Sequence, residues 1–386
     1  MLGGAMVACA SMWAGTAFAG EAKGAVVNKS IRPGEVWLDT AGKPIQAHGG
    51  SVIAVGKEFY WYGENKEFTD GKQGIESYGI RFYRSRDLYN WTDLGALIPP
   101  DLTDASSPLS PKIFPERPHI LYNPRTRKFI CWIKIRAKGP QYRTVMTADA
   151  ITGPYAMVHR ELRPAGMAAG DFDLVVDAKT GKAFMVFEHD HNEVVSIQLD
   201  DDWTNVTDRF TRHFTGRKPP NVAEGIACFQ RRGKVYLTCS QMTGYFPNPS
   251  SYAIADHVMG PYGPLQDLYP SDRSLSSFNS QISSIFKHPT KRDLYIALAD
   301  RWLPQFSGQP QFESGEMSRL VRSGITKATS TPRQPLTPEE RAALLPAMAI
   351  DNVNTSVSRY VWLPIKFRGT QASIEWRSQW RVEDYD

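Results

Sequence analysis

The sequence predicts an all-β protein, a five-bladed β-propeller, and three observations lead to that prediction. A hairpin-like pair of apolar runs occurs five times, at residues 50–63, 117–135, 172–188, 225–240 and 282–300. Each pair is a short strand, a turn of Gly, Pro, Asn, Asp or Lys, and a second strand rich in Tyr, Phe, Val and Ile. The runs begin about 53 to 68 residues apart, which is the repeat length of propeller blades. Helical periodicity is scarce, and its clearest case is residues 337–349, with Thr337 as the cap and Pro338 at the first helical position.

The remaining segments complete the blades. Outer strands with their turns, marked by an Asp before the turn and an aromatic residue after it, are expected at residues 83–91, 147–155 and 254–262. Residues 359–367 and 373–380 return to a strand pattern, and we assign them to the fifth blade or to closure of the ring. The proline-rich stretch 303–350 has the composition of a loop or helix insertion. We therefore expect one propeller domain over residues 31–386.

Polar side chains stand at the start of each predicted inner strand. They are Gln46 with His48, Glu116, Asp171 with Asp173, Glu224 and Gln281. The innermost strands of a propeller run along its central axis, so we expect these side chains to meet in one funnel although they lie far apart in sequence. Asp171 and Asp173 are two residues apart on the same face of a strand, and which of them faces the funnel is left open.

Composition and charge narrow the class of protein. Of 386 residues, 41% are hydrophobic and 22% charged, which is ordinary globular material. The formal net charge is +5 and the basic residues are spread along the chain, so nucleic acid is not an expected partner. Residues 1–19 are small and apolar and end in Ala17-Phe18-Ala19, the pattern of a signal-peptidase site, which predicts export to the periplasm or the medium. No other segment approaches the roughly 18 apolar residues of a membrane span, and we expect a monomer that binds no membrane.

Cysteine usage gives no disulfide framework. Without the leader an odd number of cysteines remains, namely Cys131, Cys228 and Cys239. Counted outward from the turn at residues 232–233, Cys228 opposes Leu237 rather than Cys239, so a bridge between these two cysteines is open only on a diagonal. Buried free thiols are the alternative.

The funnel carboxyls favour glycoside chemistry. Glu224 lies among small residues before an apolar strand, which suits a partly desolvated carboxyl with a raised pKa, although a solvated glutamate at a strand start is the alternative. Glu116 and Asp171 repeat the pattern. The sequence has no metal-ligand spacing, phosphate loop or Ser-His-Asp signature, whereas paired carboxyls hydrolyse glycosides. Aromatic residues that either stack on sugars or belong to the core are Trp61, Tyr62, Trp132, Tyr245 and Trp302.

Several long segments carry a resemblance to a known family. They are residues 39–66, 116–132, 242–249, 278–281, 299–302 and 359–364. Together they resemble glycoside hydrolase family 43, and more narrowly its exo-β-1,3-galactanase branch. The match covers most of the chain from about Ile31 onward.

This resemblance implies a five-bladed propeller that hydrolyses with inversion of configuration. Glu224 matches the proton donor and Asp171 the aspartate that tunes it. Most of the family has a base aspartate on the first blade, but this chain reads QAHGG there, without a carboxylate. The galactanase branch shares the gap and is thought to recruit a glutamine, matched here by Gln281. Because an amide is a poor base, Gln281 would act as an imidic acid or only hold the water, with Glu116 assisting.

Other matched residues are expected to bind the sugar. They are Gln46, Glu64, Tyr142, Thr243 and Trp302, with Asp173 as the alternative to Asp171. His48 holds a water or ion at the hub, or else is satisfied by the backbone of the tight turn at Gly49-Gly50. No cofactor or catalytic metal is expected, and a structural hub ion such as calcium is left open.

The predicted function is release of galactose from the end of β-1,3-galactan, the backbone of arabinogalactan, with inversion. An α-L-arabinofuranosidase or β-galactofuranosidase of the same fold is one alternative. A non-catalytic carbohydrate-binding propeller is the other, because the base aspartate is absent.

Overall fold

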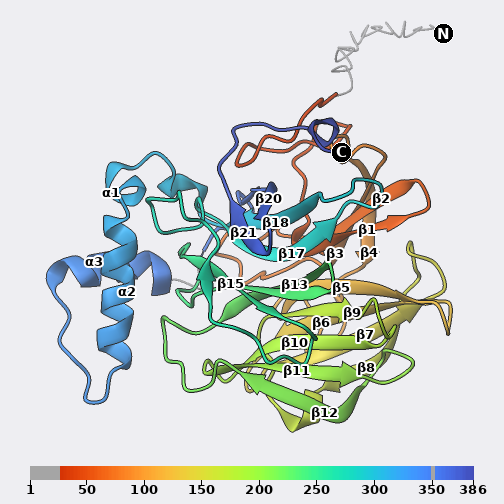
Figure 1. The fold of residues 1–386 in the computed structure, drawn as a ribbon, viewed down its shortest axis with the longest axis horizontal. Coiled ribbons are helices and arrows are strands. Elements are labelled where there is room, and N and C mark those ends of the chain that lie inside the picture. The colour runs from red at the N-terminus through yellow and green to blue at the C-terminus, as the bar shows by residue number, and fades with distance from the viewer. Residues whose placement is uncertain (1–26, 349–352) are drawn as a thin grey trace, which may run out of the picture.

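The computed structural model describes residues 27–348 and 353–386, which form five antiparallel sheets arranged as a five-bladed β-propeller (Figure 1). The all-β fold predicted from the hairpin repeat is therefore confirmed. The expected leader at residues 1–19 lies outside the described residues.

Each of the first four blades uses four consecutive strands, the first of which is innermost. Blade 1 contains β1 (His48–Val55), β2 (Glu58–Glu64), β3 (Ile80–Ser85) and β4 (Thr92–Ile98). Blade 2 contains β5 (Phe114–Asn123), β6 (Lys128–Arg136), β7 (Tyr142–Ala148) and β8 (Ala156–Leu162). Blade 3 contains β9 (Phe172–Val176), β10 (Ala183–His189), β11 (Glu193–Leu199) and β12 (Val206–His213). Blade 4 contains β13 (Glu224–Arg231), β14 (Lys234–Ser240), β15 (Ser250–Ala255) and β16 (Gln266–Asp267).

The fifth blade is interrupted by the insertion. It consists of β17 (Gln281–Lys287), β18 (Tyr295–Arg301), β20 (Leu363–Arg368) and β21 (Gln371–Ile374), and β19 (Arg359–Tyr360) pairs with β18. The segment predicted as a strand at 373–380 is thus extended only at its start. Its last residue, Trp380, instead forms an isolated bridge with Ile31, with N–O distances of 2.9 and 3.0 Å, and so ties the start of the described chain to its end.

Among its described residues, the insertion between β18 and β19 holds three α-helices, which stand out on one side of the blades (Figure 1). They are α1 (Pro310–Glu313), α2 (Glu316–Thr329) and α3 (Pro338–Met348). The predicted α3 is confirmed, and a capping box starts it, because Glu340 N donates to Thr337 Oγ1 at 3.2 Å and Thr337 N to the Glu340 carboxylate at 2.9 Å. The composition of 303–350 concealed α2, whose Gly324 lets Leu344 of α3 pack closely.

The core is divided into clusters between neighbouring blades. The cluster that joins blades 5 and 1 is rich in tryptophan, with Trp61, Trp91, Trp362 and Trp380 buried. Trp37 packs edge-on against Trp362, with ring centroids 5.1 Å apart. Because no strand is exchanged between the first and last blades, this aromatic cluster and the Ile31–Trp380 bridge close the ring.

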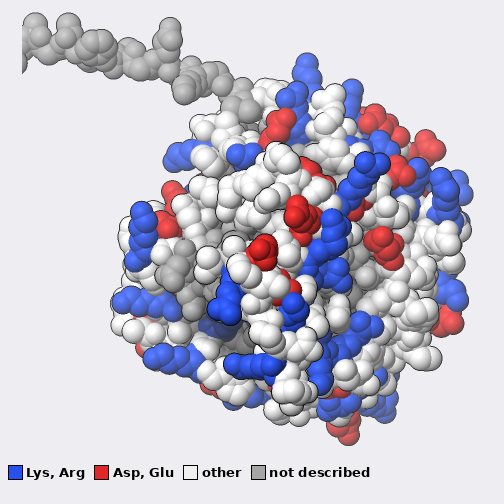
Figure 2. All heavy atoms as spheres, turned by 90° about the vertical axis from the view of Figure 1, so that its left-hand side faces the viewer, with Lys and Arg blue, Asp and Glu red and all other residues white. Residues whose placement is uncertain are grey.

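The cysteines and surface charges complete the description. Cys131, Cys228 and Cys239 are buried free thiols, and Cys228 pairs with Leu237 as the register count predicted. On the face in Figure 2, basic side chains lie among acidic and uncharged ones, at the centre as well as at the rim. Within the described residues, every helix is too short or too polar to cross a membrane.

Removal of the central indole of the closure cluster tests its role. Trp362→Ala should lower the free energy of unfolding by about 3–5 kcal/mol, because a fully buried indole leaves a cavity. Trp376→Ala is the matched control, since this ring is 41% exposed, and we expect about 1 kcal/mol or less. Chemical denaturation midpoints measure both changes, and equal shifts for the two variants would contradict the proposed closure.

Candidate active site

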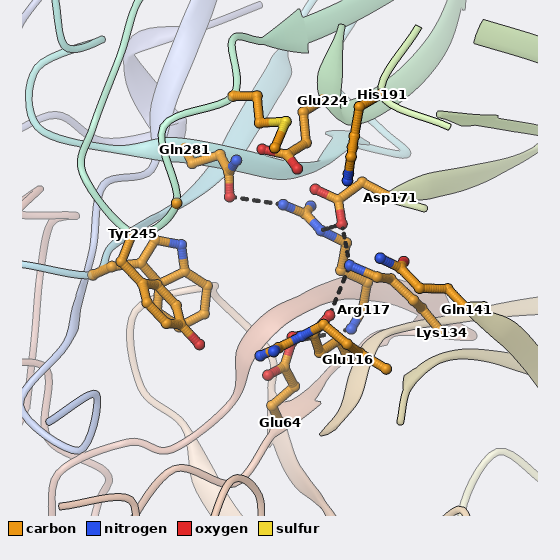
Figure 3. A pocket seen from close by; sticks show the side chains of 14 residues that line it. Glu64, Glu116, Arg117, Lys134, Gln141, Asp171, His191, Glu224, Tyr245 and Gln281 are labelled. Carbon is orange, nitrogen blue, oxygen red and sulfur yellow. Dashed lines mark hydrogen bonds and ion pairs between the residues drawn. The ribbon is translucent and has the colours of Figure 1, made fainter. Parts of the chain in front are cut away.

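The inner strands converge on one cavity of about 210 Å³ (Figure 3). Glu116, Asp171, Glu224 and Gln281 line it, each at or beside the start of the inner strand of its blade. The remaining lining residues are Glu64, Arg117, Lys134, Arg136, Gln141, His191, Met242, Gly244, Tyr245 and Trp302. All five blades therefore contribute to a single site.

Bulges interrupt three inner strands beside the cavity, and Glu116 and Glu224 at two of them line it. The pairing register shifts directly after His48 in β1, after Glu116 in β5 and after Glu224 in β13. The residues that follow are Gly49, Arg117 and Gly225, with φ of 61°, 48° and 58°. A bulge turns a strand locally and redirects its side chains. Glycine adopts these angles freely, but Arg117 holds a left-handed conformation that costs free energy and is met most often at functional sites.

Contacts between neighbouring blades surround the cavity. In four blades, one residue of the second strand is paired in register with His48, Glu116, Glu224 or Gln281 of the inner strand. Each of these second-strand residues contacts the next blade. The contacts are Glu64 with the Arg117 N–H, Lys134 with Asp171, Ser240 with Gln281, and Asp300 with His48. Between blades 3 and 4 the Asp171 carboxylate takes this role, because it accepts from the Gly225 N–H at 3.0 Å.

Lys134 bridges two buried carboxylates. Its Nζ lies 2.7 Å from Asp171 Oδ1 and 2.7 Å from Glu116 Oε2. Burial alone would raise the pKa of Glu116, but Lys134 and Arg136 outweigh burial and lower the pKa to about 2. Burial also opposes ionisation of Asp171, yet Arg117 and Lys134 hold the pKa of that carboxyl well below its usual range. Both groups are therefore anions at neutral pH.

Glu224 has the opposite electrostatic environment. Desolvation raises its pKa to about 8, and the negative charge of Asp171 acts in the same direction. Lys134 and His191 act in the opposite direction without outweighing burial, and the Glu224 carboxyl lies in Figure 3 between Gln281 on one side and Asp171 and His191 on the other. Glu224 is therefore protonated at neutral pH beside an ionised aspartate, and this is the state that a proton donor needs.

Gln281 is held by both ends of its amide. Its Oε1 accepts from Arg117 Nη2 at 2.8 Å, and its Nε2 donates to Ser240 Oγ at 3.0 Å. Arg117 also places Nε 3.0 Å from Asp171 Oδ1. The amide packs against the backbone directly after Glu224, since a Cβ on Gly225 would lie 3.2 Å from Gln281 Nε2. One guanidinium thus connects the amide of blade 5 to the carboxylate of blade 3.

Further expected residues lie in the lining. Glu64 is buried, accepts from the Arg117 N–H at 3.0 Å and pairs with Lys66 at 2.8 Å. Trp302 and Tyr245 form an edge-on aromatic pair with ring centroids 5.4 Å apart. Tyr245 faces the Glu116 side of the cavity (Figure 3). These rings are placed to contact a bound molecule, whereas Trp61, Tyr62 and Trp132 are buried in the core.

Four residues expected to bind the sugar or a hub water, namely Gln46, His48, Tyr142 and Thr243, lie outside the cavity lining. His48 is fully buried, bonds Asp300 through Nδ1 at 2.9 Å and stacks on Tyr360. Gln46 is buried and donates to Ser356 O, and Thr243 is buried and bonds Phe246 O and Asn248. Tyr142 packs beside the cavity residue Gln141 but does not line it. These side chains therefore lie outside the lining of the cavity, and their role in binding sugar stays a prediction.

The choice between Asp171 and Asp173 is decided by geometry. Asp171 lines the cavity and Asp173 does not. Asp173 lies 3.2 Å from His119 Nδ1 and accepts from the Cys228 N–H at 2.8 Å. Burial raises the pKa of Asp173 to about 7 and lowers that of His119 to about 3, so the two form a nearly neutral buried pair that connects blades 2, 3 and 4.

Sequence reasoning missed the cations of the site. Lys134 and Arg136 lie on the second strand of blade 2, opposite the residues that the inner-strand pattern selected. Their signal was a lysine and an arginine at alternate positions at the end of an otherwise apolar strand. His191 was also missed; it has a φ of 50° and contacts Glu188, whose hydrogen bond raises the pKa of the imidazole. Among the described residues, no cluster of His, Cys, Asp and Glu is arranged to hold a metal ion.

Substitution of Lys134 tests the buried charge network. Lys134→Met should lower the free energy of unfolding by about 3–5 kcal/mol at pH 7, because it leaves two buried carboxylates without their shared cation. The depressed pKa of Glu116 stabilises the fold at pH values above 4.5, the ordinary pKa of a glutamate. This stabilisation is lost as the pH falls toward about 2. The loss of unfolding free energy in Lys134→Met should therefore be smaller at pH 3 than at pH 7. Lys128→Met on the same strand removes only an exposed ion pair and should change stability by less than about 1 kcal/mol.

Comparison with solved structures shows the same fold in family 43 enzymes. A family 43 β-1,3-galactosidase is 27% identical, with a TM-score of 0.73 over 93% of this chain and 65% of its own. An exo-β-1,3-galactanase from Phanerochaete chrysosporium is 23% identical, with a TM-score of 0.71 over 92% of this chain and 68% of its own. One from Clostridium thermocellum is 22% identical, with a TM-score of 0.69 over 91% of this chain and 66% of its own. The chain thus spans slightly less than two thirds of the first of these proteins.

Sequence comparison assigns the family directly. No curated protein sequence matches the chain. The model of glycosyl hydrolases family 43 matches residues 43–310, which include every polar inner-strand residue of the cavity. Because this match covers more than half of the sequence, it shows that the chain belongs to glycosyl hydrolases family 43.

Proposed function

We propose that this protein is an exo-acting galactan 1,3-β-galactosidase that releases galactose with inversion of configuration. The observation that carries the proposal is the pair formed by Glu224 and Asp171. The raised pKa of Glu224 keeps a proton available for the leaving oxygen, and the neighbouring anion raises that pKa. Glycoside cleavage requires such an acid, paired with a group that activates water on the opposite face of the sugar.

Gln281 supplies the water side of the proposed reaction. Arg117 only donates hydrogen bonds, so its contact with Gln281 Oε1 favours the ordinary amide, in which that oxygen accepts. In this form Gln281 holds the water through its second oxygen lone pair and its second N–H. The proton lost by the water then passes to a carboxylate, and ionised Glu116 lines the same cavity.

The size of the cavity supports attack on a chain end. At about 210 Å³ it is smaller than the roughly 300–1,000 Å³ of pockets for drug-sized ligands, so it suits one terminal sugar. The related structures supply the substrate class, since the 27% identical relative is a β-1,3-galactosidase and a structure of the Phanerochaete chrysosporium enzyme holds β-1,3-galactotriose. Arabinofuranosides and galactofuranosides are the competing substrates.

The leader predicted at residues 1–19 fits action on a polysaccharide outside the cytoplasm. We propose that the enzyme is exported and acts as a monomer.

Proton NMR of the released sugar tests the reaction. Wild-type protein incubated with β-1,3-galactan should give α-galactose first, because inversion reverses the β configuration. Glu224→Gln removes the acid and should lower kcat by about 10²–10⁴-fold. Glu375→Gln, which changes only an exposed carboxylate, should retain full activity.

Three outcomes would contradict this function. Early β-galactose would refute inversion. Activity only on aryl arabinofuranosides or galactofuranosides would show that one of these, and not β-1,3-galactan, is the substrate. Folded wild-type protein that releases no sugar from any of these substrates would favour a carbohydrate-binding propeller.

The pH dependence of kcat/KM tests the tuning by Asp171. Activity should fall as the pH rises through about 8, because Glu224 then loses its proton. In Asp171→Asn the anion is gone while Arg117 and Lys134 remain, so the pKa of Glu224 falls and the alkaline limb should move to lower pH. An unchanged alkaline limb in a folded Asp171→Asn protein would show that Asp171 does not set the pKa of the acid.

A further inference from the structure

A second cavity, of about 490 Å³, lies beside the fifth blade where the helical insertion packs on it. Its wall combines the segment before β17, the end of β18, helix α1 and the residues after β21. The lining residues are Ser271, Asp272, Arg273, Ser274, Phe278, Asn279, Arg301, Ser307, Phe312, Glu313 and Trp376. None of them lines the active-site cavity.

The wall contains an unusually strained segment. Leu275, Ser277, Phe278 and Asn279 all have φ between 54° and 58°, a region that non-glycine residues rarely occupy. Asp272 holds this segment, because its carboxylate accepts from the N–H groups of Ser274, Ser276 and Phe278. Strained backbone persists only where surrounding contacts impose it, and it is concentrated at ligand sites.

One buried polar group at the wall has unused hydrogen-bonding capacity, and a buried guanidinium lies beside it. Asn279 is 2% exposed, and its Oδ1 has no donor although its Nδ2 bonds Leu303 O and Ser307 Oγ. Arg301 is 8% exposed; it donates to the backbone oxygens of Asn279 and Phe278, at 3.2 and 3.0 Å, and its guanidinium carbon lies 5.6 Å from the centroid of the Trp376 ring. An acceptor without a donor and a guanidinium that can only donate thus lie side by side. A hydroxyl group, which both donates and accepts, satisfies both.

An aromatic surface faces the same space. The Trp376 ring is 41% exposed and is held edge-on by Phe278 at 5.6 Å between centroids. Arg273 and Arg301 are balanced by Asp272 and Glu313 in the lining, so the cavity favours an uncharged ligand. An exposed indole beside groups that need hydroxyl partners is complementary to a pyranose, which has an apolar C–H face and a polar rim.

We propose that this cavity is a second, non-catalytic binding site for a sugar residue of a carbohydrate chain. Trp376 stacks on the sugar ring, and a hydroxyl group bridges Asn279 and Arg301. The cavity adjoins the active site along the chain, because Asn279 and Arg301 belong to it while Gln281 and Trp302 line the catalytic cavity. The site thus holds polymer next to the blade that supplies the water-positioning amide. The choice of β-1,3-galactan as its ligand rests on the proposed function.

The test separates binding of polymer from hydrolysis of short substrates. Trp376→Ala should lower kcat/KM on polymeric β-1,3-galactan by about 3–10-fold and leave the rate on β-1,3-galactobiose unchanged, since loss of one stacking ring costs roughly 1 kcal/mol. Tyr122→Ala, which removes an equally exposed ring from blade 2, is the control. Unfolding midpoints verify that each variant is folded. If the ratio of activity on the polymer to activity on the disaccharide were the same in the wild type and Trp376→Ala, the second site would be refuted. The proposed function would still stand.

Affinity electrophoresis tests the site even if galactan is not the substrate. Wild-type protein is run through gels that contain β-1,3-galactan, arabinan or xylan, with Glu224→Gln beside it to prevent hydrolysis. Retardation by one polysaccharide that is lost in Trp376→Ala but kept in Tyr122→Ala supports the site. Absence of retardation in every gel, or retardation unaffected by Trp376→Ala, means that the cavity holds only water and overturns the inference.

Discussion

The Asp171 carboxylate is the group on which the active site depends most. It precedes the inner strand of blade 3, accepts from the first N–H after Glu224 in blade 4, and pairs with Lys134 and Arg117 of blade 2. Its position therefore fixes three blades relative to one another. Burial raises the pKa of Glu224, and the charge of Asp171 adds to this effect, because two neighbouring carboxyls in a desolvated space do not both ionise.

This arrangement carries a cost in stability that the hub contacts offset. Burial of ions costs several kcal/mol each, and their mutual attraction repays that cost only with good geometry. Lys134, placed 2.7 Å from two carboxylates, supplies such geometry, and a bulge in each of β5 and β13 brings the partners together. At Glu224, burial and the charge of Asp171 outweigh the opposing effects of Lys134 and His191 on the pKa. The fold thus keeps Glu224 protonated at neutral pH, while the stabilising contacts are made by the neighbouring carboxylates.

The sequence allowed the blades and the polar inner-strand residues to be predicted because both follow from local patterns. Strand alternation and turn residues mark a hairpin, and the propeller axis then brings the strand starts together. The cations were missed because Lys134 and Arg117 acquire their roles through contacts between blades, which no local pattern records. Gln46, His48 and Thr243 precede or follow strands in the expected way, but bulges and turns direct their side chains into the protein. Helix α2 was hidden because its stability comes from packing against α3 at Gly324.

The first blade lacks the base aspartate of most family members, and the Asp300 carboxylate of blade 5 contacts the same stretch of the first blade. His48 stands at the start of β1, within the first-blade stretch QAHGG that has no carboxylate, and its Nδ1 lies 2.9 Å from Asp300 Oδ1. The neighbouring Gly49 N–H donates to Asp300 Oδ2 at 2.9 Å. A carboxylate at position 48 would meet the carboxylate of Asp300 in a fully buried space, and repulsion would force a proton onto one of them. A second carboxylate is therefore disfavoured beside Asp300. In the proposed reaction the role of holding water falls to Gln281, whose neutral amide is oriented by Arg117 and Ser240.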